Sequence, residues 1–264
     1  MRIDIHNHTT LCNHATGTTE EYIKRAIELK IDIFGFSEHA PMNFDQHYRL
    51  KLEDKEFYEN DVLSLKEKYK KDIKILLGYE VDYLPGDYIL KEVIDSKVDY
   101  FIGSVHFLTQ NGTQWGFDNP EFIGEYKNKN IDTIWEDYFE AIKNMAKTSK
   151  FDIVGHLDLI KVFNFLPKKD IKSIALEALQ AIKKSNMTVE INAAGYRKPI
   201  AQQYPSKELL ELCYELDIDI TFSSDAHSVD QVGYHYNEAT QLAKEVGYTQ
   251  AVYFQEREKI KIDF

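Results

Sequence analysis

The chain has 264 residues, of which 43% are hydrophobic and 29% are charged, and its formal net charge is −12. This apolar content supports a large folded core and excludes a disordered chain, while the acidic balance disfavours nucleic acid, whose binding depends on basic patches. The sequence has no apolar run near the roughly 20 residues that span a bilayer and begins without the apolar core of a secretory signal, so we expect a cytoplasmic chain with no membrane partner.

Seven segments have the apolar runs that are typical of buried parallel β-strands. They cover residues 2–8, 31–39, 73–84, 98–108, 151–157, 187–194 and 218–227. Amphipathic helix patterns lie between them, and in 131–142 and 171–182 the apolar residues recur at the three- and four-residue spacing of one helical face. Thr18 and Glu21 have the spacing of a capping box at the start of the first helix.

This alternation of strands and helices predicts about seven βα units in one domain that covers residues 1–264. We therefore expect an α/β fold whose strands form a closed or nearly closed barrel. An open, doubly wound sheet is the alternative, although no strand is followed by the glycine-rich motif of its nucleotide-binding versions. The segments 40–54 and 109–130 are predicted to be long loops at the C-terminal ends of the strands, where the active sites of barrels lie.

Histidine and acidic residues gather at the ends of the predicted strands. Nine of them lie at a strand end, late in a strand or in the loop after the first strand: His6, His8, His14, His39, Glu80, His106, His156, Asp225 and His227. Strand alternation points residues two apart in the same direction, and all strand ends of a barrel meet on one face. Histidine and carboxylate ligands without thiolate suit Zn²⁺, Mn²⁺ or Fe²⁺, and nine are enough for two or three ions. The pattern predicts a metal site at the C-terminal face of the strands.

Short motifs along the whole chain carry a more specific signal. They are DIHNH at 4–8, His14, SEH at 37–39, GYEVD at 78–82, GSVH at 103–106, GHLD at 155–158 and SDAH at 224–227. In this order they resemble the PHP family (polymerase and histidinol phosphatase), specifically its stand-alone histidinol-phosphatase branch. The resemblance implies a distorted (β/α)7 TIM-like barrel with three divalent ions. The implied ligand sets are His6, His8, Glu80 and Asp225 for one ion, Glu80, His106 and His156 for a second, and His14, His39 and His227 for a third.

For this branch the resemblance implies hydrolysis of L-histidinol phosphate to L-histidinol and phosphate, a step of histidine biosynthesis. General chemistry also supports a phosphomonoesterase, because divalent ions lower the pKa of bound water and hold phosphoryl oxygens for in-line attack. Our hypothesis is that a metal-bound hydroxide attacks phosphorus, so that turnover requires both Glu80 and Asp225.

A phosphate substrate also favours a cationic side chain in the site. Arg197 follows the sixth predicted strand, where a guanidinium fork suits phosphate, and it resembles the branch's phosphate-contacting arginine. We predict Arg197 as a catalytic and substrate-binding residue, with Lys161 and Arg49 as weaker candidates for binding phosphate. Three carboxylates beside strand ends are predicted either to line the substrate pocket or to orient ligand histidines: Asp82, Asp158 and Glu190.

Several alternatives stay open from the sequence. A related phosphoesterase or nuclease acting on another phosphate ester has the same metal ligands, and a non-catalytic metal-binding barrel is a third class. Amidohydrolases and TatD-like nucleases also place an H-x-H motif in a barrel, so the fold by itself does not separate them. The sequence assigns neither the acid that protonates the leaving alcohol, nor the metals bound in the cell, nor the oligomeric state.

Overall fold

The computed structural model describes residues 1–86, 88–110 and 112–264 of the chain. Within them, seven parallel strands form one sheet in the order β1-β2-β3-β4-β7-β8-β9. These strands are β1 (Ile3–Asp4), β2 (Ile33–His39), β3 (Lys74–Asp82), β4 (Tyr100–Ser104), β7 (Ile153–Val154), β8 (Thr188–Asn192) and β9 (Ile220–Ser223). Each lies inside one of the predicted strand segments, which confirms the predicted order of strands.

The two outer strands of this sheet approach each other through the residues that follow them. The amide of Ile5 donates to the carbonyl of Phe222 (3.3 Å), and the amide of His8 donates to the carbonyl of Ala226 (2.9 Å). Asn7 also forms an isolated parallel bridge with Ala226. The sheet is therefore a nearly closed barrel, as predicted, and the alternative of an open doubly wound sheet is wrong.

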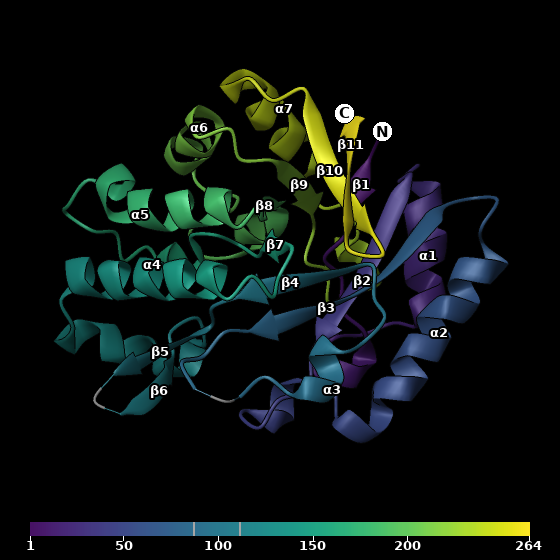
Figure 1. The fold of residues 1–264 in the computed structure, drawn as a ribbon, viewed down its shortest axis with the longest axis horizontal. Coiled ribbons are helices and arrows are strands. Elements are labelled where there is room, and N and C mark those ends of the chain that lie inside the picture. The colour runs from purple at the N-terminus through teal and green to yellow at the C-terminus, as the bar shows by residue number, and fades with distance from the viewer. Residues whose placement is uncertain (87, 111) are drawn as a thin grey trace.

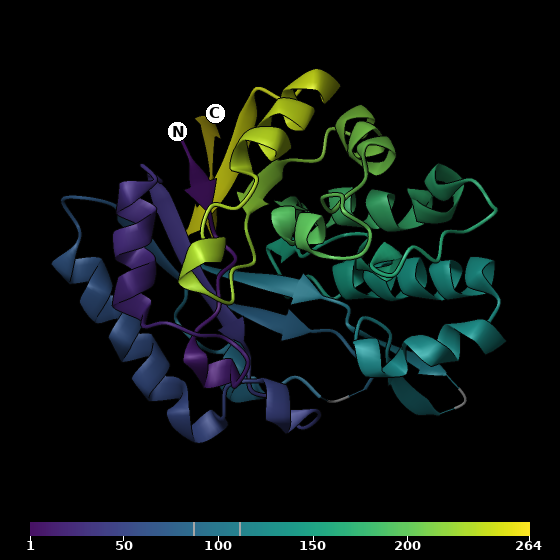
Figure 2. The same cartoon turned by 180° about the vertical axis from the view of Figure 1, so that it is seen from behind.

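Helices surround the barrel. They are α1 (Thr19–Glu28), α2 (Lys55–Lys68), α3 (Lys91–Ile94), α4 (Ile131–Lys147), α5 (Ile171–Lys184), α6 (Lys207–Glu215) and α7 (Tyr236–Val246). Figure 1 shows α4 and α5 side by side on one flank and α1 and α2 on the other, and Figure 2 shows both pairs from behind. The capping box is confirmed, since Thr18 accepts from the amide of Glu21 and Glu21 accepts from that of Thr18. Among the described residues, none of the helices is both long and apolar enough to cross a membrane.

One apolar cluster contains residues from all seven barrel strands and lies below the strand ends. Tyr100 is fully buried in it, and its hydroxyl lies 2.7 Å from the carbonyl oxygen of Ile5 and 3.0 Å from that of Phe36. A Cβ atom at Gly35 would lie 2.2 Å from that hydroxyl, so this position of β2 has room only for glycine. This packed apolar cluster thus supports the polar residues at the strand ends.

The predicted long loops contain short elements of their own. The segment 40–54 includes the 3₁₀ turns η2 (Gln46–Tyr48) and η3 (Leu52–Asp54). The segment 109–130 includes part of an antiparallel hairpin, β5 (Phe107–Gln110) and β6 (Thr113–Gly116), and the 3₁₀ helix η4 (Pro120–Asn128). The hairpin was not predicted, and Asn111 in this segment lies outside the described residues.

A second unpredicted hairpin, β10 (Gln250–Gln255) and β11 (Glu258–Asp263), follows the barrel. It contacts the segments that enter the strands: Lys74, at the start of β3, donates to the hydroxyl of Tyr253 (3.2 Å), and Lys259 pairs with Asp219 ahead of β9 (3.1 Å). Figure 1 shows it beside β1, with both chain termini close together. The hairpin therefore covers the end of the barrel where strands begin and leaves the C-terminal ends free.

Candidate metal centre

The nine residues predicted as metal ligands lie together at the C-terminal ends of the strands. His6 and His8 follow β1, His39 ends β2, Glu80 lies in β3, and His106, His156, Asp225 and His227 follow β4, β7 and β9. His14 comes from the loop after the 3₁₀ turn η1 (Thr10–Cys12). His6 and His8 are fully buried, whereas His14 is exposed, so the cluster extends from the barrel interior to its surface.

Glu80 lies between two groups of histidines, and its carboxylate oxygens face different groups. Oε2 lies 2.9 Å from Nδ1 of His39 and 3.3 Å from Nε2 of His6. Oε1 lies 3.0 Å from Nε2 of His156 and 3.7 Å from Nε2 of His106. This two-sided arrangement is suited to a carboxylate that bridges two ions.

Asp225 meets the same cluster from the other side. Its Oδ1 lies 3.3 Å from Nε2 of His8, 3.9 Å from Nε2 of His6 and 3.5 Å from Nδ1 of His227. The structure thus brings His6, His8 and Asp225 together as one group of close ligand atoms, and Glu80, His106 and His156 as another. These groups match two of the predicted ligand sets, except that Glu80 is absent from the first.

The third predicted set is arranged differently. The rings of His39 and His227 both stack against that of His8, with centroids 4.1 and 4.2 Å from it and 5.9 Å from each other, and these three residues form one group of close ligand atoms. His14 instead groups with His227 and with Cys12, a buried thiol whose Sγ lies 3.1 Å from the carbonyl oxygen of Thr9. His14, His39 and His227 therefore lie near one another without forming a group by themselves.

Several buried polar atoms in this cluster have no hydrogen-bond partner among the described residues. They include Nε2 of His6, Nε2 of His8 and Oε2 of Glu80. In addition, Nε2 of His106 and Nε2 of His156 face each other at 3.1 Å. Buried polar groups are normally paired, and convergent nitrogen and carboxylate atoms are the ligands of divalent transition metals. The donor set fits divalent metal ions.

An outer layer of carboxylates holds the other ring nitrogen of three of these histidines. Glu190 lies 2.6 Å from Nδ1 of His6, Asp82 lies 2.5 Å from Nδ1 of His106, and Glu38 lies 3.4 Å from Nδ1 of His8. Such contacts fix the tautomer and direct Nε2 toward a metal. The orienting role considered for Asp82 and Glu190 matches these contacts. Glu38 was missed, although it adjoins His39 in the SEH motif.

The third carboxylate and two of the predicted phosphate ligands form ion pairs instead. Lys161 is buried, and its Nζ contacts Asp158 (2.9 Å) and the carbonyl of Gln203 (2.7 Å). Arg49 is also buried and pairs with Asp82 at 2.9 Å. Asp158 thus contacts a lysine and not a ligand histidine, and both cations are already engaged by carboxylates.

Arg197, in the 3₁₀ helix η6 (Ala193–Arg197), has a different environment. Its Nη2 donates to the carbonyls of Ser224 (2.9 Å) and Asp225 (2.8 Å), and its guanidinium lies 5.0 Å from the ring centre of Tyr234. Nη1 has no partner among the described residues. The structure therefore places a guanidinium with a free donor beside the Asp225 loop.

The carboxylates of the cluster determine where protons reside when no metal is bound. Burial opposes a charge on His8, but the neighbouring carboxylates of Asp225 and Glu38 outweigh it and raise the pKa of His8 to about 9. Burial likewise opposes a charge on His106, but Asp82 and Glu80 raise its pKa to about 10. The pKa of Glu80 is held well below its usual range, because His6, His39 and His106 outweigh its burial.

Two residues of the cluster have unusual backbone geometry. Asp225 has φ 52° and His156 has φ 25°, both in the positive region that residues other than glycine rarely occupy. The amide of His156 donates to Glu190 (2.7 Å), which holds this conformation. Conformations of this kind persist at functional sites where the surroundings enforce them.

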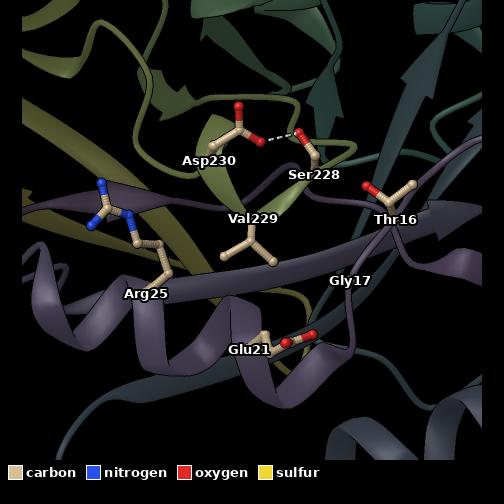
Figure 3. Close-up of a pocket in the computed structure, with 7 residues that line it drawn as sticks. All are labelled: Thr16, Gly17, Glu21, Arg25, Ser228, Val229 and Asp230. Carbon is tan, nitrogen blue, oxygen red and sulfur yellow. Dashed lines mark hydrogen bonds between the residues drawn. The ribbon is translucent and has the colours of Figure 1, made fainter.

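A shallow pocket lies on the outer side of the loops that carry His14 and His227. Figure 3 shows it between α1 and the 3₁₀ turn η7 (Val229–Gln231), with Asp230 accepting a hydrogen bond from Ser228. The backbone joins the pocket to the cluster, where the amide of Thr16 donates to the carbonyl of His227. None of the nine predicted ligands lines it.

Comparison with known proteins gives the following relatives. The family model of the PHP domain matches residues 4–194 of the chain. A Deinococcus radiodurans protein named "Probable histidinol-phosphatase" is 35% identical over 248 residues, which cover 92% of this chain and 93% of that protein. The histidinol-phosphatase of Bacillus subtilis is 28% identical over 257 residues, which cover 88% of this chain and 96% of that protein.

A solved structure has a similar fold. It is the histidinol phosphate phosphatase of Lactococcus lactis, complexed with zinc, L-histidinol and phosphate. Its sequence is 21% identical, the TM-score is 0.78, and the match covers 98% of each chain. At this identity the likeness concerns the fold, and a barrel of this type is therefore common to both proteins.

Proposed function

Because the chain belongs to the PHP domain family, we propose that it is a histidinol-phosphatase that hydrolyses L-histidinol phosphate to L-histidinol and phosphate. Two relatives that match most of its length carry that name. The reaction is a step of histidine biosynthesis, which accords with a cytoplasmic protein built as one barrel domain over residues 1–264. The observation that carries the proposal is the convergence of nine histidine and acidic residues around Glu80, with buried ligand atoms left unpaired.

The proposed cofactor is a set of three divalent ions of zinc, manganese or iron. His6, His8, Glu80 and Asp225 would hold one, Glu80, His106 and His156 a second, and His14, His39 and His227 the third. When bound, such ions supply a hydroxide nucleophile at neutral pH and positive charge for the phosphoryl oxygens. The chain's own contribution is to fix the ligands: Glu190 and Asp82 orient His6 and His106 through hydrogen bonds of 2.6 and 2.5 Å.

Arg197 is the proposed phosphate ligand of the chain itself. Its Nη2 is tied to the carbonyls of Ser224 and Asp225, so the guanidinium is held in place beside a proposed metal ligand. The unpaired Nη1 is a donor that a phosphate oxygen can satisfy. A charged donor fixed in advance binds phosphate with little loss of side-chain freedom.

Replacing Arg197 with alanine is expected to raise KM for L-histidinol phosphate and to lower kcat/KM by about 10- to 100-fold, because a charge-assisted hydrogen bond is lost. Arg197→Lys should recover only part of this loss, since an ammonium keeps the charge but not the fork. Arg25→Ala, which removes a partly exposed arginine of α1 that pairs with Glu28, is the matched control. Unchanged kinetics in Arg197→Ala would remove this residue from the substrate site.

The experiment that tests the function is phosphate release from L-histidinol phosphate and from a panel of sugar, nucleotide and aryl phosphates. The protein is loaded separately with Mn²⁺, Zn²⁺ and Fe²⁺. We expect kcat/KM for L-histidinol phosphate to exceed that of every panel member by orders of magnitude. Equal and slow rates on the whole panel would contradict the proposed substrate, and selective cleavage of another ester would favour a different phosphoesterase.

A further inference from the structure

Asp118 follows the unpredicted β5–β6 hairpin, and the hairpin brings it back to the metal centre. The pairing of Phe107 with Gly116 places the residues after β6 alongside those before β5, where His106 lies. Phe117, next to Asp118, is fully buried and packs edge-on against Tyr138 at 5.4 Å. The carbonyl of Phe117 accepts a hydrogen bond from Tyr126 (3.2 Å). Asp118 is therefore held on a fixed piece of backbone.

The carboxylate of Asp118 is only partly exposed and lacks a partner. Among the described residues, no other side chain donates a hydrogen bond to it and none forms an ion pair with it, although His106, Lys198 and His156 lie close enough to interact with its charge. Burial raises the pKa of Asp118, and these three groups offset only part of that effect. A half-buried carboxylate without a direct cation loses part of its hydration uncompensated, so its position favours a cation supplied by a ligand.

We propose that Asp118 binds the ammonium group of the substrate's alcohol and thereby makes the enzyme prefer phosphate esters of amino alcohols. The inference rests on the proposed function, because it places the substrate's phosphate at the metal centre. L-Histidinol carries such an amine, which is protonated at neutral pH. An ammonium beside Asp118 would satisfy the carboxylate through a charge-assisted hydrogen bond.

A metal ion is not the cation that this position favours. Asp118 belongs to none of the groups of close ligand atoms found among residues 1–86, 88–110 and 112–264. Lys198, the nearby lysine, follows η6 beside the proposed phosphate ligand Arg197 and is exposed. Asp118 thus lies near His106 and His156 in the segment between β6 and η4, while the cationic residues that suit phosphate come from η6 and the residue after it.

The test compares L-histidinol phosphate with imidazolylpropyl phosphate, the same ester without its amine. For Asp118→Asn, kcat/KM on L-histidinol phosphate should fall by about 10- to 100-fold, as expected for a lost hydrogen bond between charged groups. The ratio of kcat/KM between the two esters should fall by the same factor. Glu121→Gln removes an exposed carboxylate three residues further along and should leave that ratio at its wild-type value.

Equal losses on both esters would overturn the inference, because they would indicate that Asp118 protonates the leaving group or positions the metals. An unchanged ratio with unchanged rates would also overturn it. If wild-type protein does not cleave L-histidinol phosphate, the proposed function fails. The role of Asp118 is then tested separately by comparing kcat/KM for aminoethyl phosphate with that for hydroxyethyl phosphate. A wild-type preference for the amine-bearing member that Asp118→Asn removes would sustain the inference in that case.

Discussion

Replacing Glu80 with glutamine is expected to reduce kcat/KM for L-histidinol phosphate by roughly a thousandfold or more. This exceeds the roughly 10- to 100-fold loss that follows when a residue that only orients a metal ligand is removed. Glutamine keeps the shape of the side chain but removes the negative charge and replaces one oxygen by an amide. Both oxygens of Glu80 face ring nitrogens at 2.9 to 3.7 Å, so either orientation of the amide removes a ligand atom. We expect metal content, measured by elemental analysis, to fall with activity.

Two further variants show whether the loss is specific. Asp225→Asn should behave like Glu80→Gln, because Oδ1 of Asp225 faces His6, His8 and His227. Glu208→Gln changes an exposed glutamate of α6 and should retain wild-type activity and metal content. Circular dichroism must show that each variant is folded. Wild-type turnover in folded Glu80→Gln or Asp225→Asn would refute the proposed metal centre.

The convergence of the metal centre was predictable because it depends on local patterns and one topological rule. Most of the apolar runs carry a histidine or acidic residue at or near their end, as in β2, which ends at His39. In a parallel barrel all such ends lie on one face, whatever the details of packing. No long-range contact had to be known in order to bring His6, Glu80 and Asp225 together.

Features that depend on contacts between distant segments were not predictable in this way. Asp82 binds both His106 and Arg49, which lie 24 and 33 residues away in the chain, so the sequence did not show that Arg49 is already paired. The sequence did not reveal the β5–β6 hairpin, because only Val105 and His106 separate the end of β4 from the start of β5. The two strands therefore read as one segment. The register of the hairpin, which places Asp118, is a property of the folded chain.

The grouping of histidines likewise needed coordinates. Sequence order separates His8 from His39 and His227, yet both of their rings stack against that of His8. The position of the Lys161 ammonium also needed coordinates, although the three-residue spacing of Asp158 and Lys161 is common for ion pairs. Residue type and spacing thus located the site, while the sharing of ligands among ions depends on side-chain packing.

Removing the metals with a chelator is expected to abolish phosphatase activity and to lower the melting temperature. An ion present at about a thousandfold its Kd stabilises the folded state by about 4 kcal/mol, and for a chain of this size each kcal/mol shifts the melting temperature by roughly 2–4 °C. Loss of even one ion should therefore lower it by roughly 8–16 °C. Differential scanning calorimetry before and after chelation measures this, and adding Mn²⁺ should restore both properties.

The fall in melting temperature on metal removal should depend on pH, and the histidines determine whether it grows or shrinks as pH rises. In the metal-free chain, burial lowers the pKa of both histidines, but neighbouring carboxylates outweigh it. They raise the pKa of His106 to about 10 and that of His8 to about 9. The stability that these protons provide is complete below the unfolded pKa of about 6.5. It is lost as pH rises through the folded values, whereas the lowered pKa values of Glu80 and Asp225 keep both carboxylates ionised throughout.

Metal binding displaces the same protons, so metal affinity should increase with pH over the range in which the metal-free chain loses stability. The difference in melting temperature between Mn²⁺-loaded and metal-free protein is therefore expected to be larger at pH 9 than at pH 6.5. Metal uptake at pH 7.5 in a weakly buffered solution should also release protons. A difference that stays constant or shrinks with pH, together with uptake that releases no protons, would show that the metals bind elsewhere than at His8 and His106.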